Sequence, residues 1–182
     1  MLRNPEPYLR LFAEAFSRLG IPHYLHGGRP LSKSRAGQSV RLLLNILTQD
    51  FSRSAVMELI TYAPISFERF LGEDATHANP ALWNLFAIQA GIVGGLLEWK
   101  ERLEHLHRRL EWEAKQAQRA DAGETPAAMA DLTSLKALSA FLEPFFRSIE
   151  AIPRQGRWSA FSRSLGALLR ELLIAEPETQ RV

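Results

Sequence analysis

A chain of 182 residues with 46% apolar and 23% charged residues has the make-up of a folded globular protein, which excludes general disorder. Because the chain has no cysteine, disulfides, zinc–thiolate sites and thiol catalysis are excluded as well, and a reducing compartment such as the cytoplasm is expected. The formal net charge is only +2, yet residues 1–53 hold eight basic and three acidic residues, a net of +5, so the N-terminal third favours a surface that faces phosphates.

The first predicted element is an amphipathic helix. Apolar residues recur at spacings of three and four between Tyr8 and Leu19, and Gly20 ends the pattern. Residues 21–26 are partly alternating and are closed by a glycine pair, which predicts one short strand. A single strand cannot form a sheet, so this strand either packs as an extended segment or pairs with strands outside this sequence.

Two further helices are predicted before residue 70. The apolar stripe from Val40 to Leu47 predicts a helix that ends near Asp50. Ser52 is placed to cap the next helix, which Pro64 ends. Residues 72–80 contain glycine, asparagine and proline and predict a loop.

The most apolar stretch runs from Leu82 to Trp99. A membrane-spanning helix needs about 20 mostly apolar residues, and this stretch is interrupted by Asn84, Gln89 and Glu98. It therefore predicts a buried helix with a glycine break, and no membrane partner is expected. A three–four repeat that starts at Leu96 predicts a long helix to about Arg119, with a charged outer face.

The remaining chain predicts two more long helices. Residues 121–131 are small and polar and predict a loop. The three–four repeat over residues 135–152 predicts a helix that Pro144 kinks, and after a turn the repeat over residues 158–172 predicts another. Together the elements predict a mainly all-α fold: an irregular antiparallel helical bundle with a short N-terminal helix–strand appendage.

Tryptophan serves either a hydrophobic core or the stacking of bases. Trp83, Trp99 and Trp158 fall at or beside the seams of predicted helices, which favours the core. Trp112 lies next to a seam on a charged stretch and is the one candidate for exposure.

Few patterns in the sequence resemble a catalytic, phosphate-binding or metal-binding site. Gly91–Gly95 lacks the lysine and the preceding strand of a phosphate-binding loop, so it predicts helix packing or a loop. Glu98-Trp99-Lys100 matches half of a nuclease metal site but lies on a predicted helix without an upstream Pro-Asp partner. His105 and His107 point away from each other on a helix, unlike metal-binding pairs four residues apart. No catalytic residue and no metal ligand is predicted.

Several short motifs follow one another in the first third of the chain. In order they are Leu2-Arg3-Asn4, a helix, Gly20-Ile21-Pro22-His23-Tyr24, Gly27-Gly28, Pro30-Leu31 and the leucine-rich segment 42–47. This order resembles the junction of UvrD-type superfamily 1 helicases at which motor domain 2A gives way to the inserted helical domain 2B. Residues 90–103 and 152–169 look like AddB/RecC-type subunits of ATP-dependent, exonuclease V-like helicase–nucleases. The match covers residues 2–62 best, and beyond them it consists of the helical pattern and a few tryptophans.

The resemblance implies a domain division and a function. Residues 1–33 would be a remnant of motor domain 2A and residues 34–182 a 2B-like accessory domain, inside a longer open reading frame. The chain would be a non-catalytic part of a helicase–nuclease in DNA end processing and recombinational repair. Its implied partners are DNA, the remaining domains of the parent protein and a partner helicase–nuclease subunit. Arg3 falls at the family's motif IV arginine, which touches ATP phosphate, but the rest of that site is absent here. ATP and Mg²⁺ are therefore implied only for the parent family, and no cofactor is expected for this chain.

The predicted DNA contacts are basic residues around the strand–helix junction. Lysine and arginine pair with phosphates and release counterions, so weak, sequence-nonspecific and salt-dependent binding is expected. One alternative is a helical protein–protein interaction module that forms a homo-oligomer, and another is a helical enzyme with a buried site. The candidate contacts are Arg29, Lys33, Arg35, Arg41 and Arg53.

Overall fold

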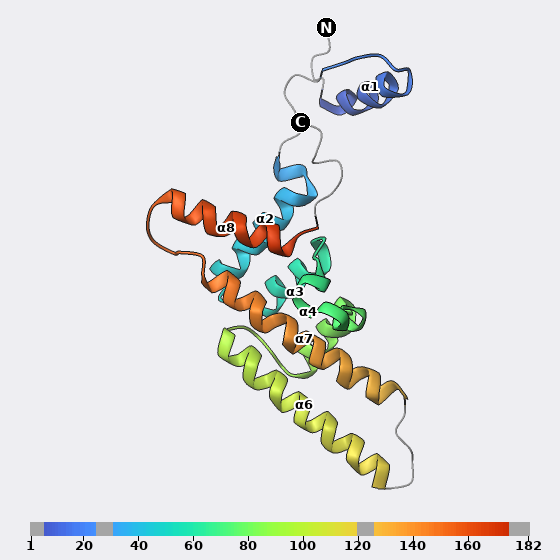
Figure 1. The fold of residues 1–182 in the computed structure, drawn as a ribbon, viewed down its shortest axis with the longest axis vertical. Coiled ribbons are helices and arrows are strands. Elements are labelled where there is room, and N and C mark those ends of the chain that lie inside the picture. Colours follow the sequence, from blue (N-terminus) through green and yellow to red (C-terminus); the bar gives the residue numbers. More distant parts are fainter. Residues whose placement is uncertain (1–5, 25–30, 120–125, 175–182) are drawn as a thin grey trace.

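The architecture is helical in every part of the chain that the structure describes (Figure 1). A computed structural model describes residues 6–24, 31–119 and 126–174. Within these ranges the only β pairing is a single bridge between Ile65 and Leu173, and the all-α prediction is confirmed. The α-helices and the two 3₁₀ helices (η) are α1 (Glu6–Arg18), η1 (Leu31–Lys33), α2 (Arg35–Thr48), α3 (Arg53–Tyr62), α4 (Phe67–Leu71), η2 (Gly72–His77), α5 (Pro80–Gln89), α6 (Leu96–Arg119), α7 (Pro126–Glu150) and α8 (Trp158–Leu172).

Helix α1 forms where the apolar repeat predicts it and ends in a Schellman turn. The Ile21 amide donates to the Phe16 carbonyl at 2.9 Å, and the Gly20 amide donates to the Ser17 carbonyl at 3.2 Å. Gly20 has a φ of +67°, in the left-handed region that favours glycine. Figure 1 shows α1 set apart from the other helices.

The predicted strand over residues 21–26 is wrong where the structure describes it. Residues 21–24 form an exposed irregular segment, and residues 25–26 lie outside the described ranges. A short alternating stretch becomes a strand only when a neighbouring strand takes its hydrogen bonds. Among the described residues no strand lies beside it.

Two serine caps set the starts of α2 and α3. Ser34 Oγ accepts from the Gly37 amide at 3.0 Å, and Ser52 Oγ accepts from the Ala55 amide at 3.3 Å. An N-cap of this kind satisfies a backbone donor that has no partner inside the helix. The cap predicted at Ser52 is thereby confirmed.

The loop predicted over residues 72–80 is wrong, because η2 and the start of α5 occupy it. Gly72 is the C-cap of α4, with a φ of +58°. Asn79 is the N-cap of α5, where its Oδ1 accepts from the Leu82 amide at 3.1 Å, and Pro80 is the first residue of that helix. The residues that suggested a loop thus end one short helix and start the next.

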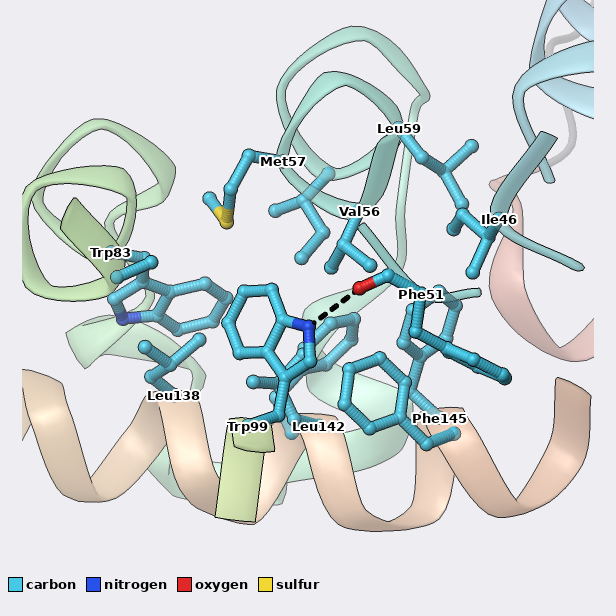
Figure 2. Close-up of a cluster of buried hydrophobic side chains, with 14 of the residues drawn as sticks. Ile46, Phe51, Val56, Met57, Leu59, Trp83, Trp99, Leu138, Leu142 and Phe145 are labelled. Atoms are coloured by element: carbon cyan, nitrogen blue, oxygen red, sulfur yellow. Dashed lines mark hydrogen bonds between the residues drawn. The ribbon is translucent and has the colours of Figure 1, made fainter. Parts of the chain in front are cut away.

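The core forms where α7 packs against α4, α5 and α6. Trp83, Phe141 and Phe145 are fully buried, and the Phe141 ring stacks on both neighbours, with centroids 5.6 Å from Trp83 and 5.2 Å from Phe145. Figure 2 shows Trp83 and Trp99 between the side chains of α3 and those of α7. Truncation of such a ring to alanine typically costs about 3–5 kcal/mol.

A tight turn before α3 is held by α6. Asp50 and Phe51 have φ values of 47° and 53°, a left-handed conformation that costs non-glycine residues roughly 1–2 kcal/mol each. The Trp99 indole Nε1–H donates to the Phe51 carbonyl at 2.8 Å (Figure 2), and the Gly95 amide donates to the Asp50 carbonyl at 2.7 Å. These two bonds stabilise a backbone that local sequence disfavours.

The glycines before α6 allow residues 93–95 to lie close to the backbone of residues 50–53. A Cβ on Gly94 would lie 3.1 Å from the Ser52 Cα atom, tighter than most Cβ contacts, and Gly95 has a φ of +81°. The Arg53 amide also donates to the Val93 carbonyl at 2.9 Å. The prediction that this cluster serves packing or forms a loop is confirmed.

The apolar stretch Leu82–Trp99 is divided between α5 and the start of α6, as the predicted glycine break requires. Within the described ranges no helix is both long enough and apolar enough to cross a membrane.

Helices α6 and α7 run antiparallel side by side (Figure 1). The loop predicted over residues 121–131 is too long, since α7 begins at Pro126, where proline needs no amide partner. Residues 120–125 lie outside the described ranges. Helix α7 continues through Pro144, where the sequence predicts a kink.

Helix α8 is anchored at its C-terminal end. Leu168 and Leu172 are buried, the Ser66 amide donates to the Leu172 carbonyl at 2.9 Å, and the Ile174 amide donates to the Pro64 carbonyl at 2.8 Å. The first turn of α8 has no such cover, and Trp158 is 76% exposed. 

The core prediction for the tryptophans holds for two of them. Trp83 and Trp99 are 0% and 1% exposed. The prediction is wrong for Trp158, because the buried residues of α8 lie nearer its C-terminal end. Trp112, the predicted candidate for exposure, is 62% exposed.

Candidate nucleic-acid interface

The predicted cations at the N-terminal end divide into those outside the described residues and those on the surface. Arg3 and Arg29 lie outside the described ranges. Lys33 on η1 and Arg35 and Arg41 on α2 are exposed. Among the described residues of the predicted interface, these three are the exposed ones.

Arg35 and Arg41 share α2 but not one face of it. They are six positions apart, which places them about 120° apart around the helix axis. Arg35 Nη2 donates to the Tyr62 carbonyl at 3.3 Å, and Arg41 Nε donates to Gln38 Oε1 at 3.0 Å. A guanidinium carries five N–H donors, so Arg41 retains donors for a phosphate.

Arg53 has a structural contact of its own. It is half-buried at the start of α3, and its Nη1 donates to Asn84 Oδ1 at 3.1 Å. The bond links α3 to α5, two elements that pack together. The structure therefore separates Arg53 from the exposed cations with which the sequence grouped it.

The exposed cations lie in a stretch without acidic residues. Between Glu14 and Asp50 the sequence contains no aspartate or glutamate. The basic residues of this stretch are Arg18, Arg29, Lys33, Arg35 and Arg41.

A second stretch without acidic residues was missed by the sequence analysis. Residues 151–170 contain four arginines and no aspartate or glutamate. The structure places Arg154 and Arg157 in the connection from α7 to α8, beside the exposed Trp158. The charge after residue 53 sums to −3, which hides this local excess of arginine, and the helical repeat predicts a core position for Trp158. An arginine-rich run around a tryptophan was the available clue.

An open groove of about 640 Å³ runs along α6 and α7. Its apolar floor includes Leu103, Leu142 and Phe146, and both acidic and basic side chains line its rims. This mixture gives the groove no preference for an anion.

In the part of the chain that the structure describes, the glycine cluster 91–95 and Glu98 are engaged in contacts within the protein. In a phosphate loop the backbone amides point at the phosphates, but here the Gly95 amide donates to Asp50, and the Gly94 amide donates to Glu98 Oε2 at 3.2 Å. Glu98 also pairs with Arg102 at 3.6 Å. Among the residues that the structure describes, no group of three histidine, aspartate or glutamate side chains could hold a metal ion.

Comparisons of the chain with protein families, with curated proteins and with solved structures found no match.

Proposed function

We propose that this chain is a non-catalytic helical accessory domain of a cytoplasmic DNA helicase–nuclease that acts in DNA end processing and recombinational repair. It contributes contacts to DNA, to the other domains of its parent protein and to a partner subunit. The motif order of residues 2–62, which resembles the 2A/2B junction of UvrD-type helicases, supports the proposal. ATP and Mg²⁺ belong to the parent protein in this proposal.

The observation that carries the DNA contact is the exposure of Lys33, Arg35 and Arg41 in a stretch without aspartate or glutamate. Each cation that neutralises a phosphate releases condensed counterions, which favours binding at low salt. Phosphates carry no base information, so the binding is nonspecific. Because Arg35 and Arg41 lie about 120° apart around α2, they do not face one ligand together, and weak affinity is expected.

The contact to other domains is supported by α1. Tyr8, Leu11, Phe12 and Leu19 are all exposed, although their spacing makes one apolar face. An amphipathic helix is stabilised mainly by burying that face against another surface. In the proposed parent protein, the rest of motor domain 2A supplies the surface.

The DNA contact is tested by reversing charge at Lys33, Arg35 and Arg41 together. Single-stranded and duplex DNA are titrated by fluorescence anisotropy from low to physiological salt. We expect at least tenfold weaker binding and a salt slope for duplex that is shallower by about 2–3, near 0.9 for each lost phosphate contact.

The matched control reverses charge at Lys100, Arg108 and Arg109, three exposed cations on α6 that lie among glutamates. The total charge change is the same in both triple variants. The proposal is contradicted if the wild-type chain binds no DNA at low salt, or if both variants lose the same affinity.

A second candidate function is a protein–protein interaction module that forms a homo-oligomer, and the exposed face of α1 favours it. Size-exclusion chromatography with light scattering separates the two. A monomer fits the accessory-domain proposal. A stable dimer that Leu11→Ser with Phe12→Ser dissociates, in a chain without DNA affinity, favours the homo-oligomer.

A further inference from the structure

The connection from α7 to α8 presents an aromatic surface to solvent. Trp158 is 76% exposed, and its ring stacks on Phe161 with centroids 5.2 Å apart and an interplanar angle of 27°. Phe161 is half-buried and packs against the core, so it supports one side of the indole. A supported, exposed ring is a ready surface for a further planar group.

Two arginines stand beside this ring. An open hollow of about 250 Å³ is lined by Arg154, Arg157, Trp158 and Phe161. Both arginines are exposed, and neither guanidinium forms a hydrogen bond or ion pair with another described residue. The residues that line the hollow include these two arginines and no acidic residue, so the lining carries net positive charge.

The backbone of the connection also favours a negatively charged ligand. Gly156 has a φ of +134°, which lets the chain turn between Arg154 and Arg157. Helix α8 starts immediately after the turn, and a helix N-terminus carries a partial positive charge. The hollow thus combines an aromatic face with fixed positive charge.

Aromatic platforms beside cations are the arrangement that binds single-stranded nucleic acid, since bases stack on the rings while phosphates pair with lysine or arginine. We propose that the α7–α8 connection is a stacking site for single-stranded DNA. An unpaired base lies on the open face of Trp158, and Arg154 and Arg157 hold the flanking phosphates. The choice of DNA as the ligand rests on the proposed function, while the preference for an unpaired strand comes from this site alone.

Trp112 shows that exposure by itself does not make such a site. It is 62% exposed on α6, yet its sequence neighbours are Glu111 and Glu113. Their carboxylates repel phosphate, so Trp112 is the matched control for Trp158.

The test titrates the full chain with a short oligothymidine and with a duplex. Trp158→Ala should weaken binding to oligothymidine by about 5- to 150-fold, the range for losing one stacked base, and should leave duplex binding nearly unchanged. Trp112→Ala should change neither. In a Trp112→Phe background, oligothymidine should quench tryptophan emission, because the two other tryptophans are buried.

Further variants separate stacking from charge. Trp158→Phe should retain most of the affinity, and Arg154→Glu with Arg157→Glu should weaken binding to both ligands. If Trp158→Ala binds oligothymidine like the wild type while the arginine variant is weakened, the connection is only an electrostatic contact and the stacking site is overturned. Circular dichroism checks that each variant is folded.

The two proposals fail in distinguishable ways. If the wild-type chain binds neither ligand at low salt, both fall. If charge reversal at Lys33, Arg35 and Arg41 removes duplex binding while Trp158→Ala changes nothing, the accessory-domain proposal survives alone. If Trp158→Ala weakens oligothymidine binding while that triple variant behaves like its control, the stacking site survives alone.

Discussion

Trp99 joins two distant turns of the chain through one side chain. Its indole N–H donates to the Phe51 carbonyl, and the ring is buried. Trp99→Phe keeps an aromatic ring but removes the donor and leaves a small cavity. We expect the free energy of unfolding to fall by about 2–3 kcal/mol, measured by urea denaturation. Trp112→Phe on the same helix is exposed and should change it by less than about 0.5 kcal/mol. Equal losses would show that the Phe51 contact is unimportant.

Replacing each of two glycines with alanine should change the stability in opposite directions. Gly95 has a left-handed φ of +81°, so Gly95→Ala is expected to lower stability by about 1–2 kcal/mol. Gly166 lies inside α8, and an added Cβ would meet only the flexible end of Arg170 at 3.5 Å. Gly166→Ala should raise stability by about 0.5–1 kcal/mol through helix propensity. Thermal unfolding of both variants checks the pair, and a shared sign would refute the backbone argument.

At the scale of elements, the start of α5 depends on one cap. Asn79 Oδ1 accepts from the Leu82 amide, and α5 carries the buried Trp83. Asn79→Ala should lower the free energy of unfolding by about 1 kcal/mol, because a backbone donor loses its partner. Asn79→Asp keeps the acceptor and adds a charge that favours a helix N-terminus, so it should retain the stability. Chemical denaturation that shows the same loss for both variants would contradict the cap.

Helix positions could be predicted because their causes are local. Gly20 and Ser52 act through partners within five residues, and apolar stripes repeat every three or four. Burial could not be predicted in the same way. Trp158 belongs to the same repeat as Leu168, yet only Leu168 reaches the core. What decides this is the contact of the end of α8 with the Pro64–Ser66 segment, which lies far away in the sequence.

In the candidate interface, too, some features could be predicted from the sequence and others depend on the fold. Arg41 and Arg53 are equivalent in the sequence pattern, and both were predicted to contact DNA. Only the fold reveals that Arg53 donates to Asn84, 31 residues away, while Arg41 stays on the surface. Conversely, the absence of acidic residues around Arg154 and Arg157 was readable in advance. The exposure of the tryptophan beside them was not.

At the scale of the whole molecule, stability should be uneven. None of the residues described from Tyr8 to Tyr24 is fully buried, whereas α7 carries the centre of the core. An isolated helix as short as α1 is marginal in water. Hydrogen-exchange mass spectrometry should therefore find α1 exchanging at least about a hundredfold faster than α7. Equal protection would mean that α1 is covered in solution, as the homo-oligomer requires.

The bond from Trp99 to Phe51 has a consequence for biosynthesis. The left-handed turn at residues 50–51 is synthesised before Trp99, whose donor lies 48 positions later than Phe51. Until then the nascent turn has only water to satisfy its carbonyl groups. Helices α2 and α3 can each form during translation, but the turn between them gains these two hydrogen bonds only after Gly95 and Trp99 have been added.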